Sequence, residues 1–246
     1  MSEPDPNPMP LGRVEGAVAK LFTKPAGVQA VVDVADGFRL VTLAGAALRQ
    51  VAWSPGQKVQ VLLGGWVQRT YTPLAWDPDA GVTQLLAYAH GTGPGAAWAR
   101  ALRVGGACHL FGPRRSLELS SLGRPALLFG DETSFGLAHA LRFTPHAARD
   151  VHIVLEVGSS LAARAALAAI GVADAHLVER RARDAHLAEV QELASELCRT
   201  HAIDAGALSG KATSIARLGK HLRQLGVPRS RLLIKAYWAE GKTGLD

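Results

Sequence analysis

Short apolar runs separated by turn residues follow one another through the first half of the chain. Dipeptides such as Asp36-Gly37 and Pro55-Gly56 separate the runs, which occupy residues 14–22, 28–34, 38–43, 59–67, 84–89 and 107–111. Strands of this length with turn signals between them are typical of antiparallel barrels and sandwiches. The pattern predicts an antiparallel β-barrel domain over residues 13–122, after a disordered N-terminal lead-in over residues 1–12.

The pattern of apolar residues changes after residue 122. Segments in which apolar residues recur every three or four positions alternate with compact apolar runs at residues 125–129, 151–155, 175–178, 205–208 and 232–237. This alternation predicts a parallel, doubly wound α/β domain over residues 123–246. Such sheets bind ligands at the carboxyl ends of their strands. The predicted binding rim therefore comprises residues 130–133, 156–159, 179–183, 209–211 and those from 238 onward.

One candidate site lies where a strand-like run ends, at Gln68-Arg69-Thr70-Tyr71-Thr72-Pro73. Side chains alternate along a strand, so Arg69 and Tyr71 share a face, and Thr72 joins them only if Pro73 breaks the strand. An arginine fork, an aromatic ring and a hydroxyl suit a ligand that has a phosphate and a planar heterocycle. An edge-strand arginine beside a core tyrosine explains the same residues equally well.

A glycine-rich loop, His90-Gly91-Thr92-Gly93-Pro94, interrupts the strands and precedes a predicted helix over residues 95–102. Pro94 fits the first turn of a helix, where its missing N–H does no harm. The free N–H groups at the start of the helix predict an anion cradle. A tight connection that needs positive φ at its glycines is the alternative.

Composition restricts the class of protein. The 246 residues are 48% hydrophobic and 20% charged, which suits one large or two small globular domains. No apolar run approaches the ~20 residues of a membrane span, and the first ten residues do not resemble a signal peptide. Cys108 and Cys198 lie far apart without metal-ligand spacing, so neither a disulfide framework nor a metal site is expected. These features predict a cytoplasmic protein.

The formal charge of +6 favours an anionic partner. Nucleic acid is not expected, because no recognition motif occurs and apolar periodicity interrupts the basic residues. The Gly-x-Gly-x-x-Gly fingerprint does not follow the first strand of the second half, and no Walker sequence occurs. Conventional Rossmann dehydrogenases and P-loop enzymes are therefore disfavoured.

The order of the two predicted domains and several strings of residues resemble the siderophore-interacting protein family, also called ferric-siderophore reductases, among the ferredoxin-reductase-like flavoproteins. The strings are Arg69-Thr70-Tyr71-Thr72-Pro73, His90-Gly91-Thr92-Gly93-Pro94 with Trp98, Gly112-Pro113-Arg114-Arg115-Ser116, Gly130-Asp131-Glu132-Thr133 and Lys235-Ala236-Tyr237-Trp238 with Gly241. The resemblance implies FAD in the first domain and NADPH or NADH as the electron donor in the second.

For FAD, the resemblance implies that Arg69 holds the diphosphate, that Tyr71 stacks on the isoalloxazine and that Thr72 lies near its reactive nitrogen. The backbone of residues 90–96 wraps the diphosphate, and Trp98 packs against either the cofactor or the barrel. Further FAD contacts are expected from Thr70, His90, Gly91, Gly93, Pro94, Ala96 and Ser116.

For the nicotinamide, the resemblance implies that Asp131, Glu132 and Thr133 lie where the ring approaches the flavin, with Thr133 touching a ring. Three arginines, Arg180, Arg181 and Arg183, follow the third predicted strand of the second domain. They can read the ribose phosphate of NADPH there, or they can simply be solvated charge.

Two strings depart from the family pattern. Ser134-Phe135-Gly136-Leu137 stands where Ala-Leu-Pro-Ala is usual, which changes the packing of the helix under the flavin. Ser209-Gly210-Lys211 stands where Ala-Gly-Glu is usual. This exchange of an acid for a base changes the nicotinamide site, and Lys211 can supply a positive contact to phosphate.

The predicted function is that of an FAD-dependent ferric-siderophore reductase, which passes electrons from NAD(P)H to chelated ferric iron and releases ferrous iron in the cytoplasm. Flavin chemistry of this kind requires no acid or base from the protein. Lys235 is the candidate contact for the anionic siderophore; the alternative is a lysine that reaches from the last strand to solvent. A general NAD(P)H:flavin oxidoreductase with another acceptor and a non-enzymatic flavin or siderophore binder are the alternative functions.

Overall fold

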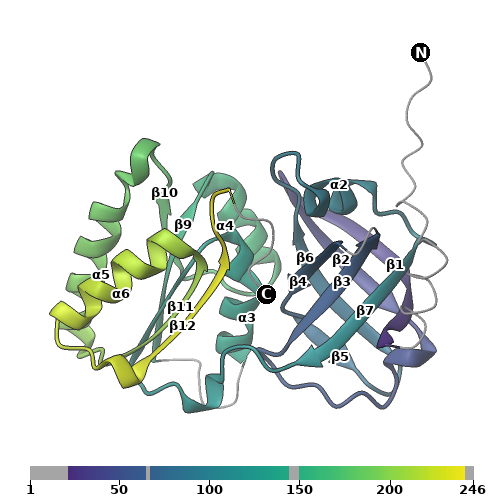
Figure 1. Ribbon diagram of the computed structural model, residues 1–246, viewed down its shortest axis with the longest axis horizontal. Helices are drawn as coiled ribbons and strands as arrows, with labels where there is room; N and C mark the ends of the chain where they lie inside the picture. Colours follow the sequence, from purple (N-terminus) through teal and green to yellow (C-terminus); the bar gives the residue numbers. More distant parts are fainter. Residues whose placement is uncertain (1–21, 65–66, 144–149, 242–246) are drawn as a thin grey trace. The chain divides into compact units, whose positions relative to one another are not determined.

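The computed structural model describes residues 22–64, 67–143 and 150–241 (Figure 1). The predicted lead-in and nearly all of the first predicted strand lie outside these ranges. The chain divides into two compact units, Met1–Arg114 and Arg115–Asp246.

The first unit contains an antiparallel sheet in the order β4-β3-β7-β1-β2-β6-β5. Its strands are β1 (Lys24–Ala35), β2 (Phe38–Ala44), β3 (Lys58–Gly64), β4 (Val67–Tyr71), β5 (Ala75–Asp77), β6 (Val82–Tyr88) and β7 (Ala107–Arg114). The sheet curls on itself and brings β4 close to β6 (Figure 1). The antiparallel β architecture that the sequence predicts for this half is confirmed.

Alternating side chains build the core of this unit. Strands β2 and β6 pair along their whole length, from Phe38 opposite Tyr88 onward, and Val41, Leu43 and Leu85 on these strands are fully buried. Helix α2 (Pro94–Ala101) packs Trp98 into the same core. The helix therefore belongs to the β unit and starts beside its strands.

Two details of the β unit differ from the prediction. The run at 59–67 is not one strand: it contributes to β3 and β4, which pair antiparallel with Val61 opposite Arg69. Strand β5 is absent from the prediction, because three residues with one buried side chain, Trp76, are too short to display a period of two.

The second unit contains a parallel sheet in the order β10-β9-β8-β11-β12. Its strands are β8 (Ala126–Gly130), β9 (Val151–Val157), β10 (His176–Glu179), β11 (Ala205–Lys211) and β12 (Leu232–Trp238). Every residue of β8 and β11 is buried, which explains why β8 and the first four residues of β11 form continuous apolar runs. The predicted parallel α/β architecture is confirmed.

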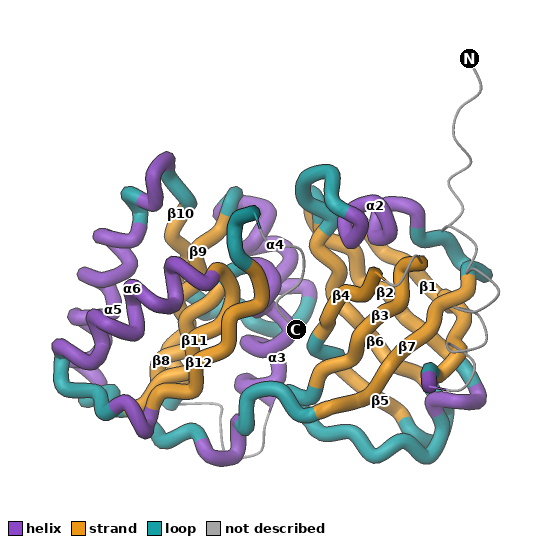
Figure 2. Tube along the Cα trace, viewed as in Figure 1, coloured by secondary structure: helices purple, strands orange, loops and turns teal. Residues whose placement is uncertain are grey.

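Helices cover the two faces of the parallel sheet. They are α3 (Phe135–Phe143), α4 (Ser160–Ala169), α5 (Leu187–His201) and α6 (Ala212–Gln224). The apolar stripes of α5 and α6 pack on one face, and α3 and α4 lie against the other (Figure 2). Within the described ranges, no helix combines the length and the apolar character that a membrane span requires.

Strand order fixes where a ligand of this unit would bind. From the central strand β8 the chain moves outward through β9 to β10, and then crosses to β11 and β12 on the opposite side. The direction of winding reverses between β8 and β11, and doubly wound sheets bind ligands at the carboxyl ends of their strands at this switch point. Asp131 and Lys211 stand at these two strand ends.

Candidate functional site

Arg69 of the edge strand β4 lies against the start of helix α2. A Cβ atom placed on Gly95 would be 3.1 Å from Cγ of Arg69, so the absence of a side chain at Gly95 allows this approach. The half-buried guanidinium donates a hydrogen bond from Nη1 to the carbonyl oxygen of Gln68 at 2.7 Å. The strand thus brings a cation to the N-terminal end of a helix.

The first turn of α2 is suited to an anion. Gly93 occupies the N-cap in an extended conformation, and no side chain of the described residues caps the turn. Pro94 has no N–H, and the N–H groups of Gly95 and Ala96 come before that of Ala97, which donates the first intrahelical hydrogen bond, to the carbonyl oxygen of Gly93. With the neighbouring Arg69, this turn offers the charge and the donors that a phosphate requires.

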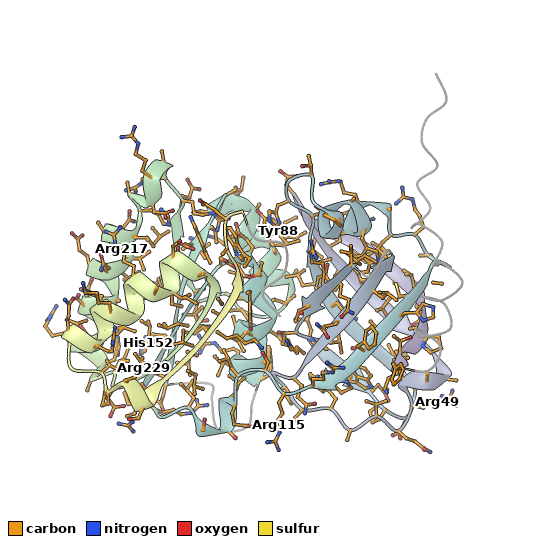
Figure 3. All side chains as sticks on the ribbon, in the orientation of Figure 1. Arg49, Tyr88, Arg115, His152, Arg217 and Arg229 are labelled. Atoms are coloured by element: carbon orange, nitrogen blue, oxygen red, sulfur yellow. The ribbon has the colours of Figure 1, made fainter. Side chains whose placement is uncertain are left out.

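Helix α2 also fixes the loop that precedes it. The guanidinium of Arg100 donates to the carbonyl oxygens of Ala89 at 3.0 Å and Gly91 at 2.8 Å. His90 is exposed, and its ring stacks on Tyr88 at a centroid distance of 4.4 Å (Tyr88 is labelled in Figure 3). Tyr88 in turn stacks on Phe38 at 4.5 Å. The sequence carries no signal for this role of Arg100, because only the fold shows that its side chain turns back to the loop.

Tyr71 and Trp98 face each other at 5.5 Å between ring centroids. Both pack against the core of the β unit. Burial raises the pKa of Tyr71 above its ordinary range, although Arg69 opposes this shift, so the phenol stays neutral. Arg69 and Tyr71 therefore both face α2, whereas Thr72 follows the end of β4 and is half-buried.

Of the other residues predicted at FAD, Thr70 pairs with Gln60 across β3 and β4. Gly91, Gly93 and Pro94 are exposed, and Ala96 is buried at the start of α2. In the second unit, the hydroxyl of Ser116 is buried and has no hydrogen-bond partner among the described residues. A buried hydroxyl without a partner is a donor and acceptor that a bound ligand can satisfy.

Asp131 joins the ends of three parallel strands. Its carboxylate, only 1% exposed, accepts hydrogen bonds from the N–H and the hydroxyl of Thr133, from the backbone N–H of Lys211 at 3.0 Å and from Nε1 of Trp238 at 2.7 Å. Gly210 (φ +104°) makes room for it, because a Cβ there would lie 2.5 Å from Oδ2. Burial raises the pKa of Asp131 to about 6, and the hydroxyl of Thr133 opposes this shift.

Arg180 is engaged in internal contacts. Its Nη2 donates to both carboxylate oxygens of the buried Glu132, at 2.6 and 2.7 Å, and its Nη1 donates to the carbonyl oxygen of Glu156 at 3.0 Å. Arg181 is 59% exposed and pairs with Glu189 on α5. Arg181 and Arg183 are the exposed cations of this turn, whereas the side chain of Arg180 is 25% exposed and paired with Glu132.

A buried pair, His186 and Glu156, contacts the same turn. Nε2 of His186 lies 2.7 Å from Oε2 of Glu156, and both side chains are almost completely buried. Nδ1 of His186 accepts the backbone N–H of Arg181 at 3.2 Å, so Nε2 carries the proton that is donated to Glu156. No sequence pattern predicts this pair, because its members are 30 residues apart.

Lys211 lies between two carboxylates. Its Nζ is 2.9 Å from Oδ1 of Asp184 and 2.7 Å from Oε1 of Glu240, and the lysine side chain is only 7% exposed. The ammonium also lies 5.9 Å from the centroid of the Trp238 ring.

Lys235, the residue predicted to contact the siderophore, is half-buried on β12, opposite Ser209 of β11. Thr133, which was predicted to touch a ring, is exposed beside Asp131. In the described ranges, no group of three or more His, Cys, Asp or Glu residues could hold a metal ion.

Comparisons with known proteins agree with this architecture. The family model described as siderophore-interacting protein matches residues 124–241, and the model described as siderophore-interacting FAD-binding domain matches residues 65–117. Together they cover more than two thirds of the chain. No curated protein matches the sequence.

Solved structures of the same family share the fold. The siderophore-interacting protein SipS from Aeromonas hydrophila is 19% identical, with a TM-score of 0.68 over 90% of this chain and 93% of that one. A siderophore utilization protein from T. fusca is 19% identical, with a TM-score of 0.69 over 91% and 95%.

The fold extends to another group of flavoproteins. The ferredoxin reductase of carbazole 1,9a-dioxygenase is 18% identical, with a TM-score of 0.63 over 88% of this chain and 66% of that one. At these identities the structural matches show the fold, and the two family models carry the assignment. The chain belongs to the siderophore-interacting protein family, whose fold is that of the ferredoxin-reductase-like flavoproteins.

Proposed function

We propose that the protein is a flavin-dependent reductase that passes electrons from NADPH or NADH to ferric iron held by a siderophore. The observation that carries the proposal is the approach of Arg69 to Gly95, because it joins a cation to an uncapped helix start within the region that matches the FAD-binding model. The low cysteine content supports the prediction of a cytoplasmic reaction.

The residues of the β unit fit FAD. Arg69 and the N–H groups of Gly95 and Ala96 would hold the diphosphate, and Tyr71 would offer its ring to the isoalloxazine while Thr72 offers a hydroxyl at the end of β4. When bound, FAD supplies a group that accepts a hydride and releases electrons one at a time. Because the phenol of Tyr71 stays neutral, it brings no negative charge to the flavin.

The electron donor would bind to the parallel sheet at the switch point between β8 and β11. Exposed Thr133 stands at this position and would contact the nicotinamide, while Asp131 fixes the backbone and the hydroxyl of Thr133 by hydrogen bonds. The exposed arginines, Arg181 and Arg183, would supply cations to the ribose phosphate of NADPH.

The acceptor would be an anionic ferric chelate. Siderophore oxygens are hard ligands that suit the ferric ion, so reduction weakens the complex. The formal charge of +6 favours the approach of an anion. Lys235 on β12 is the residue proposed to contact it.

Anaerobic titration followed by visible spectroscopy tests the proposal. Protein loaded with FAD should lose its flavin absorbance on addition of NADPH or NADH, and regain it when a ferric siderophore is added while ferrous iron accumulates. Rapid bleaching without reoxidation by any ferric chelate would instead favour an oxidoreductase with another acceptor. Failure of both nucleotides to bleach the flavin would favour a binding protein or a different electron donor.

A further inference from the structure

Lys211 connects the segments that surround the switch point of the parallel sheet. Its ammonium binds Asp184, in the turn after β10, and Glu240, after β12, while its backbone N–H binds Asp131, after β8. One residue at the end of β11 therefore holds the segments that follow three other strands.

The two ion pairs of Lys211 are asymmetric in exposure. The lysine side chain is 7% exposed, but those of Asp184 and Glu240 are 34% and 77% exposed. Burial alone would lower the pKa of Lys211, but the hydrogen bonds that its ammonium donates to Glu240 and Asp184 raise it, so the group stays an ammonium ion. A buried cation with accessible counter-ions can exchange those counter-ions for another anion without ever losing its charge.

The backbone next to Lys211 also suits an anion. Lys211 is the N-cap of α6, and among the described residues no side chain forms a capping hydrogen bond there. The N–H groups of the first turn of a helix carry partial positive charge and bind phosphates. The ammonium and the start of α6 therefore lie together at the switch point, where doubly wound sheets bind dinucleotides.

The turn that carries Asp184 is held in a conformation that is costly for its residues. Arg183 and Asp184 are both left-handed, with φ of 56° and 55°. This conformation is uncommon for residues other than glycine, although aspartate adopts it more readily than most, and surrounding contacts help to hold it. The bond between Asp184 and Lys211 is one such contact, so releasing Asp184 allows the turn to relax.

We propose that Lys211 is the contact for the diphosphate of the nicotinamide dinucleotide, and that Asp184 and Glu240 are internal place-holders that the diphosphate displaces. The inference rests on the proposed use of a nicotinamide dinucleotide. It adds that Lys211 binds the diphosphate at the end of β11, in competition with Asp184 and Glu240. Bound dinucleotide thereby frees the turn after β10 and the residues after β12.

If Asp184 and Glu240 compete with the diphosphate for Lys211, replacing the lysine and replacing either carboxylate should change the dissociation constant of the nucleotide in opposite directions. Lys211→Met removes a charge-assisted contact and should raise the dissociation constant about tenfold or more. Asp184→Asn and Glu240→Gln each remove a competitor and should lower it about two- to fivefold. If the three side chains only stabilised the fold, all three variants would weaken binding or leave it unchanged.

Calorimetric titration of the FAD-loaded protein with NAD⁺ and NADP⁺ measures these constants. Both nucleotides should respond by the same factor, because they share the diphosphate. Glu192→Gln on the exposed face of α5 makes the same change of charge and should leave affinity unaltered. In a Lys211→Met background, the gain from Asp184→Asn should disappear.

Several outcomes would overturn the inference. One is weaker nucleotide binding by Glu240→Gln. The others are a gain in affinity from Asp184→Asn that persists in the Lys211→Met background, and a change in affinity confined to NADP⁺. Glu240→Gln keeps the test decisive if Lys211→Met fails to fold, because Glu240 is largely exposed. Absence of nucleotide binding in the wild type would also refute it, whereas reduction of ferric chelate by dithionite-reduced holoprotein would still support the second half of the proposed function.

Discussion

The carboxylate of Asp131 accepts a hydrogen bond from the indole nitrogen of Trp238 at 2.7 Å, across 107 residues of sequence. This bond joins the end of β8 to the end of β12, although β11 lies between the two strands. Asp131 and Trp238 both belong to the binding rim that the sequence predicts, and the structure adds the direct bond between them.

Asp131→Asn should destabilise the protein in a pH-dependent way. An amide can accept fewer of the hydrogen bonds that Asp131 accepts, which costs about 1–3 kcal/mol. Because burial raises the pKa of Asp131 from 3.8 to about 6, the folded wild type holds this proton more tightly than the unfolded chain, and its stability falls by up to about 3 kcal/mol as pH rises from 4 to 6. The difference in unfolding free energy between wild type and variant should therefore be larger at pH 4 than at pH 7.

Urea unfolding of both proteins between pH 4 and pH 7 measures this difference. A constant difference across that range would show that Asp131 has the same pKa in the folded and unfolded states.

Gly95→Ala should separate stability from cofactor affinity. Alanine favours helices by up to about 1 kcal/mol over glycine, so the apoprotein should gain stability or lose none. The new methyl group would lie 3.1 Å from Cγ of Arg69 and displace the guanidinium, and FAD affinity should fall about tenfold. Thermal unfolding of the apoprotein and fluorescence titration with FAD measure the two quantities.

A matched control and a second variant sharpen this test. Gly27→Ala adds a methyl group to β1 at an ordinary contact distance of 3.9 Å and should leave FAD affinity unchanged. Arg69→Ala should lose at least as much affinity as Gly95→Ala, and the double variant should lose no more than Arg69→Ala. Additive losses would mean that Gly95 does not act through Arg69.

Arg180→Ala should mainly lower the stability of the protein, whereas Arg181→Ala should mainly raise KM for NADPH. Removing Arg180 leaves the buried carboxylate of Glu132 without its ion pair, at a cost of about 3–5 kcal/mol in unfolding free energy. Removing Arg181 breaks an exposed pair worth at most about 1 kcal/mol, and should raise KM for NADPH more than KM for NADH.

Denaturant titration and steady-state kinetics with both nucleotides check this contrast. Equal KM changes for the two nucleotides in Arg181→Ala would rule out a ribose-phosphate contact by that residue.

Replacing His186 and Glu156 together should cost less stability than replacing His186 alone. His186→Leu leaves a buried carboxylate unpaired and should cost about 3–5 kcal/mol. The double variant His186→Leu with Glu156→Leu removes the charge as well, and should recover much of that loss. Unfolding by denaturant compares the three proteins, and a double variant less stable than His186→Leu would contradict the account.

Sequence patterns sufficed for features that depend on local periodicity. Buried strands such as β8 and β11 read as apolar runs because both faces are covered, and the amphipathic helices α5 and α6 show their period directly. The direction of a long side chain is not local. Arg180 was predicted at the binding rim from its place after a strand, but Glu132, 48 residues earlier, determines where its guanidinium lies.

The candidate site also combines features that the sequence predicts with contacts that only the fold determines. The strings around Arg69 and Gly93 indicated phosphate chemistry, but their meeting at Gly95 depends on how β4 passes α2. Lys211 was recognisable as a departure from the family pattern. Its two carboxylate partners come from different loops and follow no sequence spacing.

Arg100 gives the anion cradle a property that its composition does not suggest. The last turn of α2 binds the carbonyl groups of Ala89 and Gly91, so the loop before the helix is tied to the helix itself. Such a loop has little conformational entropy left to lose when a ligand arrives, and preorganisation of this kind strengthens binding without adding a contact. Cofactor uptake by the β unit should therefore resemble docking to a rigid receptor.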